Sequence, residues 1–444
     1  MSFRNKYLIN NSFFKNFSFL LFKDIQDLGK KCFLLGVLFL PTALVFSALF
    51  FLVSLIIAFW NSRNFLIKDY WNISTLIALG IILFSTFGTF FIYKPPEVEE
   101  LKLYTIWINI FNWIPILLSF IGFQIYLKDE KDKLVFAKFL ILGTIPVIFS
   151  CFYQLLFDSG KDVNFLNGLI IWFQKPLEET AGISGLFSNK NYTGTWLSVT
   201  LPFSFALISE KNNQKAISKL FLKFISALIT YFIFLTNSRN AFLTMLLSII
   251  FFYGLKKFIF FIVILLVLFF GIKFFSETFN FFSSDANNLL SQGEIFKRLS
   301  TQPEFKKFLR YEIWESSVKF IMQRPLLGWG AGTFALIYKF LPNILNPPNA
   351  QHTHNLPLEL AFNFGIPFSL FITFIFTKLF FESCVKFYKD INLKHYSYID
   401  KAWIASTGVL FFINMTDVTL YDGRIGLITG ILLAGLRTSL KRKD

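Results

Sequence analysis

The chain has 444 residues, of which 55% are hydrophobic, 16% are charged and 64 are phenylalanine. Soluble globular proteins carry about 25% charged residues and distribute their apolar residues in short periodic runs. Here the apolar residues form uninterrupted blocks, such as FIFFIVILLVLFF at Phe258–Phe270. This composition excludes a soluble enzyme, a disordered chain and a disulfide-stabilised secreted domain, and it indicates a polytopic membrane protein.

The formal charge of +16 comes from 43 Lys and Arg against 27 Asp and Glu. In a membrane protein the usual source of such an excess is cytoplasmic loops rich in Lys and Arg. No nucleic-acid-binding signature interrupts the apolar blocks, so the lipid bilayer is expected as the environment and nucleic acid is not expected as a partner. Cys32, Cys151 and Cys384 are isolated, which indicates neither a disulfide framework nor a zinc site.

Membrane spans of about 20 mostly apolar residues can be counted along the chain. The block 33–60 is long for one span and short for two, and Pro41 interrupts it. We interpret this block as a hairpin of two spans, which gives about twelve spans in total. The other candidates, in chain order, are 74–93, 107–127, 135–157, 194–209, 217–236, 240–255, 257–275, 356–380, 402–418 and 423–437.

Basic residues at both ends of the chain set the expected orientation. Both termini should be cytoplasmic, so the number of spans must be even. A single span at 33–60 would send several basic loops across the membrane. The expected fold is therefore an all-α integral membrane protein with about twelve transmembrane helices and one large extracytoplasmic loop domain. Its parts are a cytoplasmic N-terminal segment at 1–31, a first transmembrane bundle at 32–275, a large periplasmic loop at 276–355, C-terminal transmembrane helices at 356–437 and a cytoplasmic tail at 438–444.

Local signals inside the large loop predict a helix followed by a sharp return of the chain. Apolar residues recur at steps of three and four from Phe308 to Gln323, which predicts an amphipathic helix. Pro325 should end that helix, because the residue before a proline is pushed out of the α region. Three alternating glycines in PLLGWGAGTF, at residues 325–334, then predict a tight, non-helical return.

The histidines His352 and His354 lie in QHTHN, where the large loop meets the next span. A loop histidine is commonly structural, and His395 is interpreted as solvated. At the junction of a polar cap and a membrane helix, however, an imidazole can accept a proton near neutral pH. The H-x-H spacing also resembles a pair of metal ligands. Glu359 is the only carboxylate nearby and no cysteine is close, so no metal is predicted.

Arg239 is the most isolated charge in the sequence. It lies in TNSRNA between two apolar runs, and the span count places it at the outer membrane boundary. Either this arginine extends to the lipid headgroups, or its guanidinium binds phosphate through two parallel hydrogen bonds. Arg310 and Arg324 bracket the predicted loop helix, and each is either a further phosphate contact or a solvated charge.

The segment GLFSNKNYTGTW, at residues 185–196, ends the shorter outer loop. Asn189 and Asn191 offer amide donors there, or they cap a helix. Glu178 and Glu179, just before it, either orient an acceptor or are solvated, and we favour solvation. Three charged residues surround the last outer turn and are assigned no role: Asp417, Asp422 and Arg424.

Several motifs are missing from the sequence. It contains no G-x-x-x-x-G-K-[ST], which would indicate ATP binding, and no D-x-D pair suited to a metal-dependent nucleotide-sugar transferase. ATP hydrolysis is therefore not indicated. Charged residues are nearly absent from the predicted span interiors, where ion-coupled transporters usually carry them.

Four motifs occur in a characteristic order: FSNKN at Phe187–Asn191, NSRNA at Asn237–Ala241, W…RPLLGWGAGTF at Trp314–Phe334, and His354–Asn355 followed by Gly365. Over about residues 185–380 the chain resembles the O-antigen ligase and O-antigen polymerase superfamily of bacterial membrane glycosyltransferases. One departure is visible. The pattern of these proteins is H-N-x9-G-x-x-G, and here Phe368, preceded by Pro367, stands at the final glycine position.

The resemblance implies a role in lipopolysaccharide or polysaccharide biosynthesis at the bacterial inner membrane. The donor would be a glycan on a polyprenyl-pyrophosphate carrier, such as undecaprenyl pyrophosphate, and the acceptor a glycan, the lipid A core or a protein. Arg239 and Arg310 would neutralise the pyrophosphate, and His354 would take the proton from the acceptor hydroxyl. Because the donor is already activated, neither a cofactor nor a metal would be required. The implied substrate-binding residues are Asn189, Asn191, Arg324, Asn355 and His352.

Two questions stay open at this point. Ligase and polymerase share donor, architecture and implied residues, so the sequence does not separate them. A transporter of a small anion such as bicarbonate is the alternative function. The nearly uncharged span interiors and the large cap favour the enzyme, because transporters place their sites near the membrane midplane.

Overall fold

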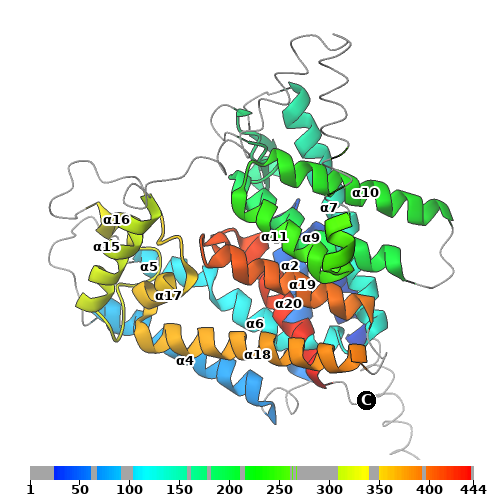
Figure 1. Ribbon diagram of the computed structural model, residues 1–444. Helices are drawn as coiled ribbons and strands as arrows, with labels where there is room; N and C mark the ends of the chain where they lie inside the picture. The colour runs from blue at the N-terminus through cyan, green and yellow to red at the C-terminus, as the bar shows by residue number, and fades with distance from the viewer. Residues whose placement is uncertain are drawn as a thin grey trace, which may run out of the picture.

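The computed structural model describes most of the chain and is almost entirely helical (Figure 1). The described residues are 25–61, 68–91, 104–157, 162–177, 182–210, 216–260, 263, 267, 309–339, 350–392 and 397–441. Within them, six helices are long and apolar enough to cross a bilayer, and these begin at Leu44, Tyr70, Thr105, Glu130, Ala216 and Ile366. The expectation of an all-α membrane protein is confirmed in this part of the chain, and the total of about twelve spans stays a prediction.

The helices follow the predicted apolar segments closely. The first half contains a helix over 25–39, α2 (Leu44–Asn61), α4 (Tyr70–Phe91), α5 (Tyr104–Asn109), α6 (Ile114–Gly122) and α7 (Glu130–Phe157). The middle contains α9 (Lys190–Ser209), α10 (Ala216–Leu235) and α11 (Arg239–Tyr253). The last part contains α15 (Leu309–Gln323), α16 (Phe334–Tyr338), α17 (Leu356–Phe364), α18 (Ile366–Asn392), α19 (Tyr398–Asn414) and α20 (Gly423–Lys441).

Short elements interrupt this helical pattern at three places. The predicted span 107–127 contains the 3₁₀ turns η1 (Ile110–Asn112) and η2 (Phe123–Tyr126) on either side of α6. The strands β1 (Val163–Phe165) and β2 (Ile170–Trp172) pair in antiparallel register across η3 (Leu166–Gly168). The sequence analysis did not predict this hairpin. The turn η5 (Thr419–Tyr421) joins α19 to α20.

The chain reverses at Pro41, where the sequence predicted a hairpin. The helix over 25–39 ends there and α2 begins at Leu44. The two helices pack against each other, because the Ser47 hydroxyl donates to the Gly36 carbonyl at 2.7 Å and the rings of Phe33 and Phe51 lie 6.1 Å apart.

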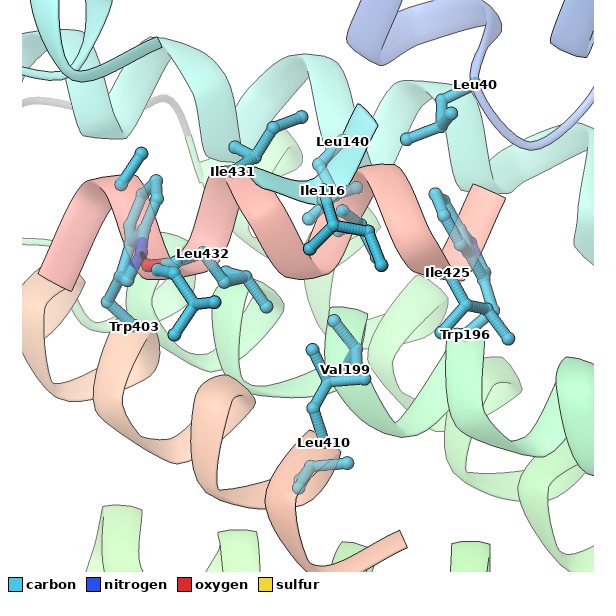
Figure 2. Packing of buried hydrophobic residues seen from close by; sticks show 14 of the residues in the cluster. Leu40, Ile116, Leu140, Trp196, Val199, Trp403, Leu410, Ile425, Ile431 and Leu432 are labelled. Atoms are coloured by element: carbon cyan, nitrogen blue, oxygen red, sulfur yellow. Dashed lines mark hydrogen bonds between the residues drawn. The ribbon is translucent and has the colours of Figure 1, made fainter. Parts of the chain in front are cut away.

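The centre of the molecule is formed by α6, α9, α19 and α20 (Figure 1). Figure 2 shows two fully buried tryptophans there, Trp196 on α9 and Trp403 on α19. The indole N–H of Trp403 donates to the carbonyl of Leu432 at 2.7 Å, which fixes its ring against α20. Close approach at this point requires Gly435, since a Cβ on that residue would lie 2.0 Å from the Trp403 ring.

The predicted single helix over 356–380 is wrong. The structure has two helices there, α17 and α18, separated at Gly365 with φ +91°. Pro367 follows the break, and the backbone N–H of Ile366 donates to the Pro325 carbonyl at 2.7 Å instead of continuing α17. The residue at the family's final glycine position, Phe368, is buried and packs edge-on against Phe364 at 5.1 Å.

The described parts of the predicted periplasmic loop are residues 309–339, which we call the cap, and residues 350–355. The cap helix α15 confirms the predicted helix from Leu309 to Gln323, and Phe308 lies outside the described residues. The three alternating glycines have φ values of +70°, +98° and +74°, which confirms the predicted return. This glycine return, residues 325–333, lies against the end of α17, because Trp329 N–H donates to Phe362 O at 2.7 Å and Gly330 N–H to Asn363 O at 3.1 Å. The return thereby attaches the cap to the helix that follows the two histidines.

Alanine in place of Gly435 should destabilise the protein. The added methyl group must displace the Trp403 ring, which its hydrogen bond to Leu432 holds in place. Overpacking of this kind costs about 1–3 kcal/mol. Thermal unfolding in detergent should show a lowered Tm for Gly435→Ala. The control is Gly80→Ala on α4, where no atom lies within 4 Å of the new Cβ. Equal Tm values for the two variants would contradict this packing.

Candidate functional site

A histidine and an aspartate from distant parts of the sequence form the centre of the site. His354 lies in the segment Gln351–Asn355, which we call the histidine loop, and Asp417 lies between α19 and η5. His354 Nδ1 is 3.1 Å from Asp417 Oδ1. A carboxylate accepts hydrogen bonds, so this contact places the imidazole proton on Nδ1 and leaves Nε2 with its lone pair.

Asp417 is buried and is held by three kinds of donor. Asn191 at the start of α9 donates its side-chain amide to Asp417 Oδ2 at 2.9 Å, and the backbone N–H of Val418 donates to Oδ1 at 2.9 Å. Burial alone would raise the pKa of Asp417. The hydrogen bond from His354 and the positive potential of Arg310 outweigh burial, so the pKa lies below its ordinary value and the carboxylate is charged.

His352 packs beside His354 and is held neutral. Their ring centroids are 4.2 Å apart, and the His352 ring is stacked on Tyr421 at 5.8 Å. Burial, with the neighbouring His354 and Arg310, lowers the pKa of His352 to about 4, although Asp417 opposes this shift. The backbone N–H of His354 donates to His352 Nδ1 at 3.3 Å, so the proton of the neutral ring belongs on Nε2, which faces Asp417 at 3.7 Å.

A buried polar network between α17 and η5 holds the histidine loop in place. The Glu359 carboxylate on α17 accepts from the backbone N–H of Thr353 at 2.8 Å and from the amide of Asn363 at 3.2 Å. The Tyr421 hydroxyl also donates to Glu359. Because Tyr421 is the residue on which His352 stacks, this network connects the histidine loop to the turn that carries Asp417. It also helps to hold His354 at φ +54°, a conformation that is uncommon for a residue with a side chain.

Arg310 faces this cluster from the cap, and Arg239 in turn interacts with Arg310. Arg239 is the first residue of α11 and is exposed, and Arg310 lies on the first turn of α15 in the cap. Burial and the repulsion of Arg239 lower the pKa of Arg310, while the attraction of Asp417 raises it. Arg310 is thus close enough to both groups to interact with each. In the described part of the chain neither guanidinium forms a salt bridge. A guanidinium group is well suited to binding an anion.

The other residues singled out in the sequence have more local contacts. Asn189 caps α9 by accepting from Asn191 N–H at 2.8 Å, and Asn355 caps α17 by accepting from Leu358 N–H at 3.1 Å. Asn355 also donates to the Met415 carbonyl at 2.9 Å, which ties the histidine loop to the end of α19. The guanidinium of Arg324 lies 4.0 Å above the Trp329 ring in the cap. Their substrate-binding roles stay predictions. Glu178, Glu179 and His395 lie outside the described residues.

A metal ion is the alternative occupant of the cluster. One possible ligand atom each from His352, His354 and Asp417 lies within 4.8 Å of the others, a spacing that a metal could use. Against this, a metal ligand must offer a lone pair. His352 Nδ1 already accepts from a backbone N–H, which leaves a proton on the Nε2 atom that faces Asp417. The hydrogen-bonded interpretation fits these contacts better, and the absence of a metal stays a prediction.

Sequence reasoning assigned no role to two residues that organise the site, Asp417 and Tyr421. Asp417 was noted only as a charge at the last outer turn, and its burial and its three donors could not be foreseen from its neighbours. One signal was available. A charged residue at the end of a predicted apolar span, as Asp417 is in 402–418, is costly unless it is paired.

Acid should destabilise the fold through His352. Its pKa is about 4 in the folded chain and about 6.5 in an unfolded one, so between these values only the unfolded state binds the proton. The contribution of His352 to the free energy of unfolding is fully present above about pH 6.5 and falls as the pH approaches 4. At pH 5 the loss is about 2 kcal/mol. Asp417 does not contribute in this window, because its pKa is lowered from 3.8.

The measurement is the Tm of detergent-purified protein from pH 7.5 to pH 5. His352→Gln cannot be protonated and should lose less stability than the natural chain over this range. Parallel curves for the two proteins would show that His352 is protonated normally in the folded state. His354, Asp417 and Arg310 act on the charge of His352, and Tyr421 stacks on its ring; all four are kept in this variant.

Comparison with known families gives a match over part of the chain. Residues 224–373 match the family model described as O-antigen ligase. The matched region runs from α10 into α18 and contains Arg239, Arg310, His352 and His354, whereas Asn191 and Asp417 lie outside it. No curated protein gives a match.

Proposed function

We propose that the chain, a member of the O-antigen ligase and polymerase superfamily through residues 224–373, transfers or polymerises glycan from a polyprenyl-pyrophosphate carrier. The acceptor is a hydroxyl at the periplasmic face of the bacterial inner membrane. The observation that carries this proposal is an aspartate-bound imidazole, His354 with Asp417, near Arg310, which itself interacts with Arg239. Such an arrangement supplies a base beside an anion site.

His354 acts as the general base. Its Nδ1–H is directed to Asp417, so Nε2 carries the lone pair that accepts the proton of the acceptor hydroxyl. Asp417 holds the ring in this tautomer and stabilises the imidazolium that forms. Asn191 fixes the other carboxylate oxygen at 2.9 Å, so the carboxylate cannot rotate away from the ring without breaking that bond.

Arg239 and Arg310 bind the pyrophosphate. The bond from the anomeric carbon to the phosphate oxygen breaks as the acceptor oxygen bonds to that carbon, and the proton passes to His354. The leaving polyprenyl pyrophosphate gains negative charge, which the two guanidinium groups stabilise. The arginines come from α11 and from the cap, so the pyrophosphate also joins the cap to the helical bundle.

The polyprenyl tail is assigned to an apolar cavity beside the site. Leu356, Pro357, Phe368 and Met415 are among the residues that line it. Leu356 and Pro357 directly follow Asn355, and Met415 accepts the hydrogen bond of Asn355, so the cavity begins next to the histidine loop. An apolar chain in this cavity and an anionic group at the arginines match the two ends of a lipid pyrophosphate.

Substitutions in the cluster should abolish transfer without unfolding the protein. His354→Gln should lower the rate by about 10²–10⁴-fold, the usual contribution of a general base. Asp417→Asn should lower it by a similar factor, because an amide can hold the wrong tautomer. Arg239→Ala and Arg310→Ala should each cost about 10²–10³-fold through lost charge stabilisation. Glycan transfer by purified protein in nanodiscs measures each effect.

The control for these variants is Lys319→Gln. Lys319 lies on α15 with Arg310, is exposed and pairs with Glu315 at 2.8 Å. The substitution therefore removes a charge from the cap away from the cluster. Its transfer rate should stay within twofold of the natural chain. Normal transfer by His354→Gln or by Arg239→Ala, at normal protein levels, would reject the proposed function.

Chelation distinguishes the hydrogen-bonded cluster from a metal centre. Protein treated with EDTA and then freed of it should transfer glycan at the untreated rate, because the pyrophosphate donor is already activated and His354 serves as base. Activity that is lost on chelation and restored by Zn²⁺ or Mn²⁺ would instead assign His352, His354 and Asp417 as metal ligands.

A further inference from the structure

A second cavity, of about 450 Å³, has His352 in its wall. Its size falls within the range of about 300–1,000 Å³ that is typical of small-molecule sites. The wall is built from separate parts of the chain, including α5, the start of α9, the glycine return, the histidine loop and the start of α20. None of these parts encloses the cavity alone, so its shape depends on the complete fold.

The chemistry of the wall suits a sugar ring. Aromatic side chains are provided by Phe173, Tyr192 and Tyr421, and amide groups by Asn109 and Gln351. A pyranose presents C–H faces that pack on aromatic rings and a belt of hydroxyls that each donate and accept hydrogen bonds. An apolar ligand would leave the amides of such a wall without partners, at a cost in binding free energy.

A buried charged pair strengthens this assignment. The side chains of Asp422 and Arg424 are each 9% exposed and both line the cavity. The guanidinium lies 3.7 Å from the Asp422 carboxylate and 3.4 Å from the Leu186 carbonyl, both longer than an ordinary N–H···O hydrogen bond. Arginine has five N–H donors, so ligand hydroxyls can form shorter and stronger bonds there.

The position of the cavity favours the acceptor over the donor. His352 lines it, whereas the cavity-lining residues do not include His354, Asp417, Arg239 or Arg310 in the described part of the chain. The pyrophosphate of the donor is assigned to the arginines, so this cavity is a separate compartment that meets the site at His352. The rings of His352 and His354 are 4.2 Å apart, and a hydroxyl of a sugar in the cavity can therefore approach the proposed base.

We propose that this cavity binds the pyranose ring that carries the acceptor hydroxyl, with Asn109, Gln351, Asp422 and Arg424 holding its other hydroxyls. This inference rests on the proposed function. It assigns the two substrates to different walls of the site: the donor pyrophosphate to α11 and the cap, and the acceptor sugar to α5, α9 and the start of α20.

The test uses oligosaccharides that carry no pyrophosphate and so cannot act as donors. One probe is released by mild acid from the lipopolysaccharide of a strain that lacks the gene, and the other from its lipid-linked glycan. The full-length protein in nanodiscs receives saturating lipid-linked glycan with a varied amount of either probe, and then a saturating amount of that probe with varied lipid-linked glycan. Both KM values are thereby measured. Asn109→Ala, Gln351→Ala and Arg424→Lys should each raise the KM for the acceptor probe tenfold or more and leave the donor KM within twofold.

Gln323→Ala is the matched control, because Gln323 is an exposed amide at the end of α15 outside the cavity wall. It should change neither KM. Gln351 is itself exposed, so its variant tests the wall even if Arg424→Lys fails to fold. Suppose that the natural chain is active and its three wall variants leave the acceptor KM unchanged or raise the donor KM instead. That result would overturn the acceptor site but not the proposed function. If the natural chain transfers glycan to neither probe and does not lengthen its lipid-linked glycan, both the proposed function and this inference are rejected.

Discussion

The buried carboxylate of Asp417 is the constraint on which the site depends. A charged carboxylate out of water is costly unless several donors hold it, and here they come from three separate places in the chain. Asn191 belongs to the start of α9, His354 to the histidine loop and Val418 to the turn after α19. Because satisfying Asp417 requires all three to meet, the interaction that stabilises this end of the fold also orients the proposed base.

The geometry of α17 extends this constraint to the cap. The glycine return donates backbone hydrogen bonds to Phe362 and Asn363 at the end of α17, and Gly365 ends that helix with a positive φ. The next helix, α18, then leaves in a new direction. A continuous helix through Gly365 would keep these carbonyls in its own hydrogen bonds. The break therefore frees the carbonyls of Phe362 and Asn363 to hold the cap. The cap in turn carries Arg310, which interacts with Asp417 after α19.

Local pattern predicted the elements well and their meeting points poorly. Apolar runs and proline positions gave α15 from Leu309 to Gln323 and the reversal at Pro41, because these signals act within a few residues. The break at Gly365 was missed because its cause is non-local: the carbonyl of Pro325, forty residues away in sequence, accepts the hydrogen bond of Ile366. Asp417 and Tyr421 were missed as site residues for the same reason, since their partners lie in the histidine loop and on α17.

The resemblance to a known family added what spacing could not supply. Residue types alone did not decide whether Arg239 extends to lipid headgroups or binds phosphate. They also did not decide whether Arg310 is solvated or functional. The structure places Arg310 close enough to Arg239 and Asp417 for its pKa to respond to both. The proposed roles of these residues in catalysis follow from chemistry that the sequence pattern suggested, and the interactions between them follow from the fold.

The net positive charge of the cluster suits the negative charge that grows on the leaving group during the proposed reaction. Two guanidinium groups and one carboxylate leave one net positive charge, and the repulsion of Arg239 contributes to the lowered pKa of Arg310. A donor pyrophosphate relieves that repulsion when it binds. Once the bond to the sugar breaks, the same phosphates carry more negative charge, so their attraction to the arginines is greater in the transition state than in the bound donor. Catalysis requires such a difference, because binding that is equally strong in both states does not raise the rate of the chemical step.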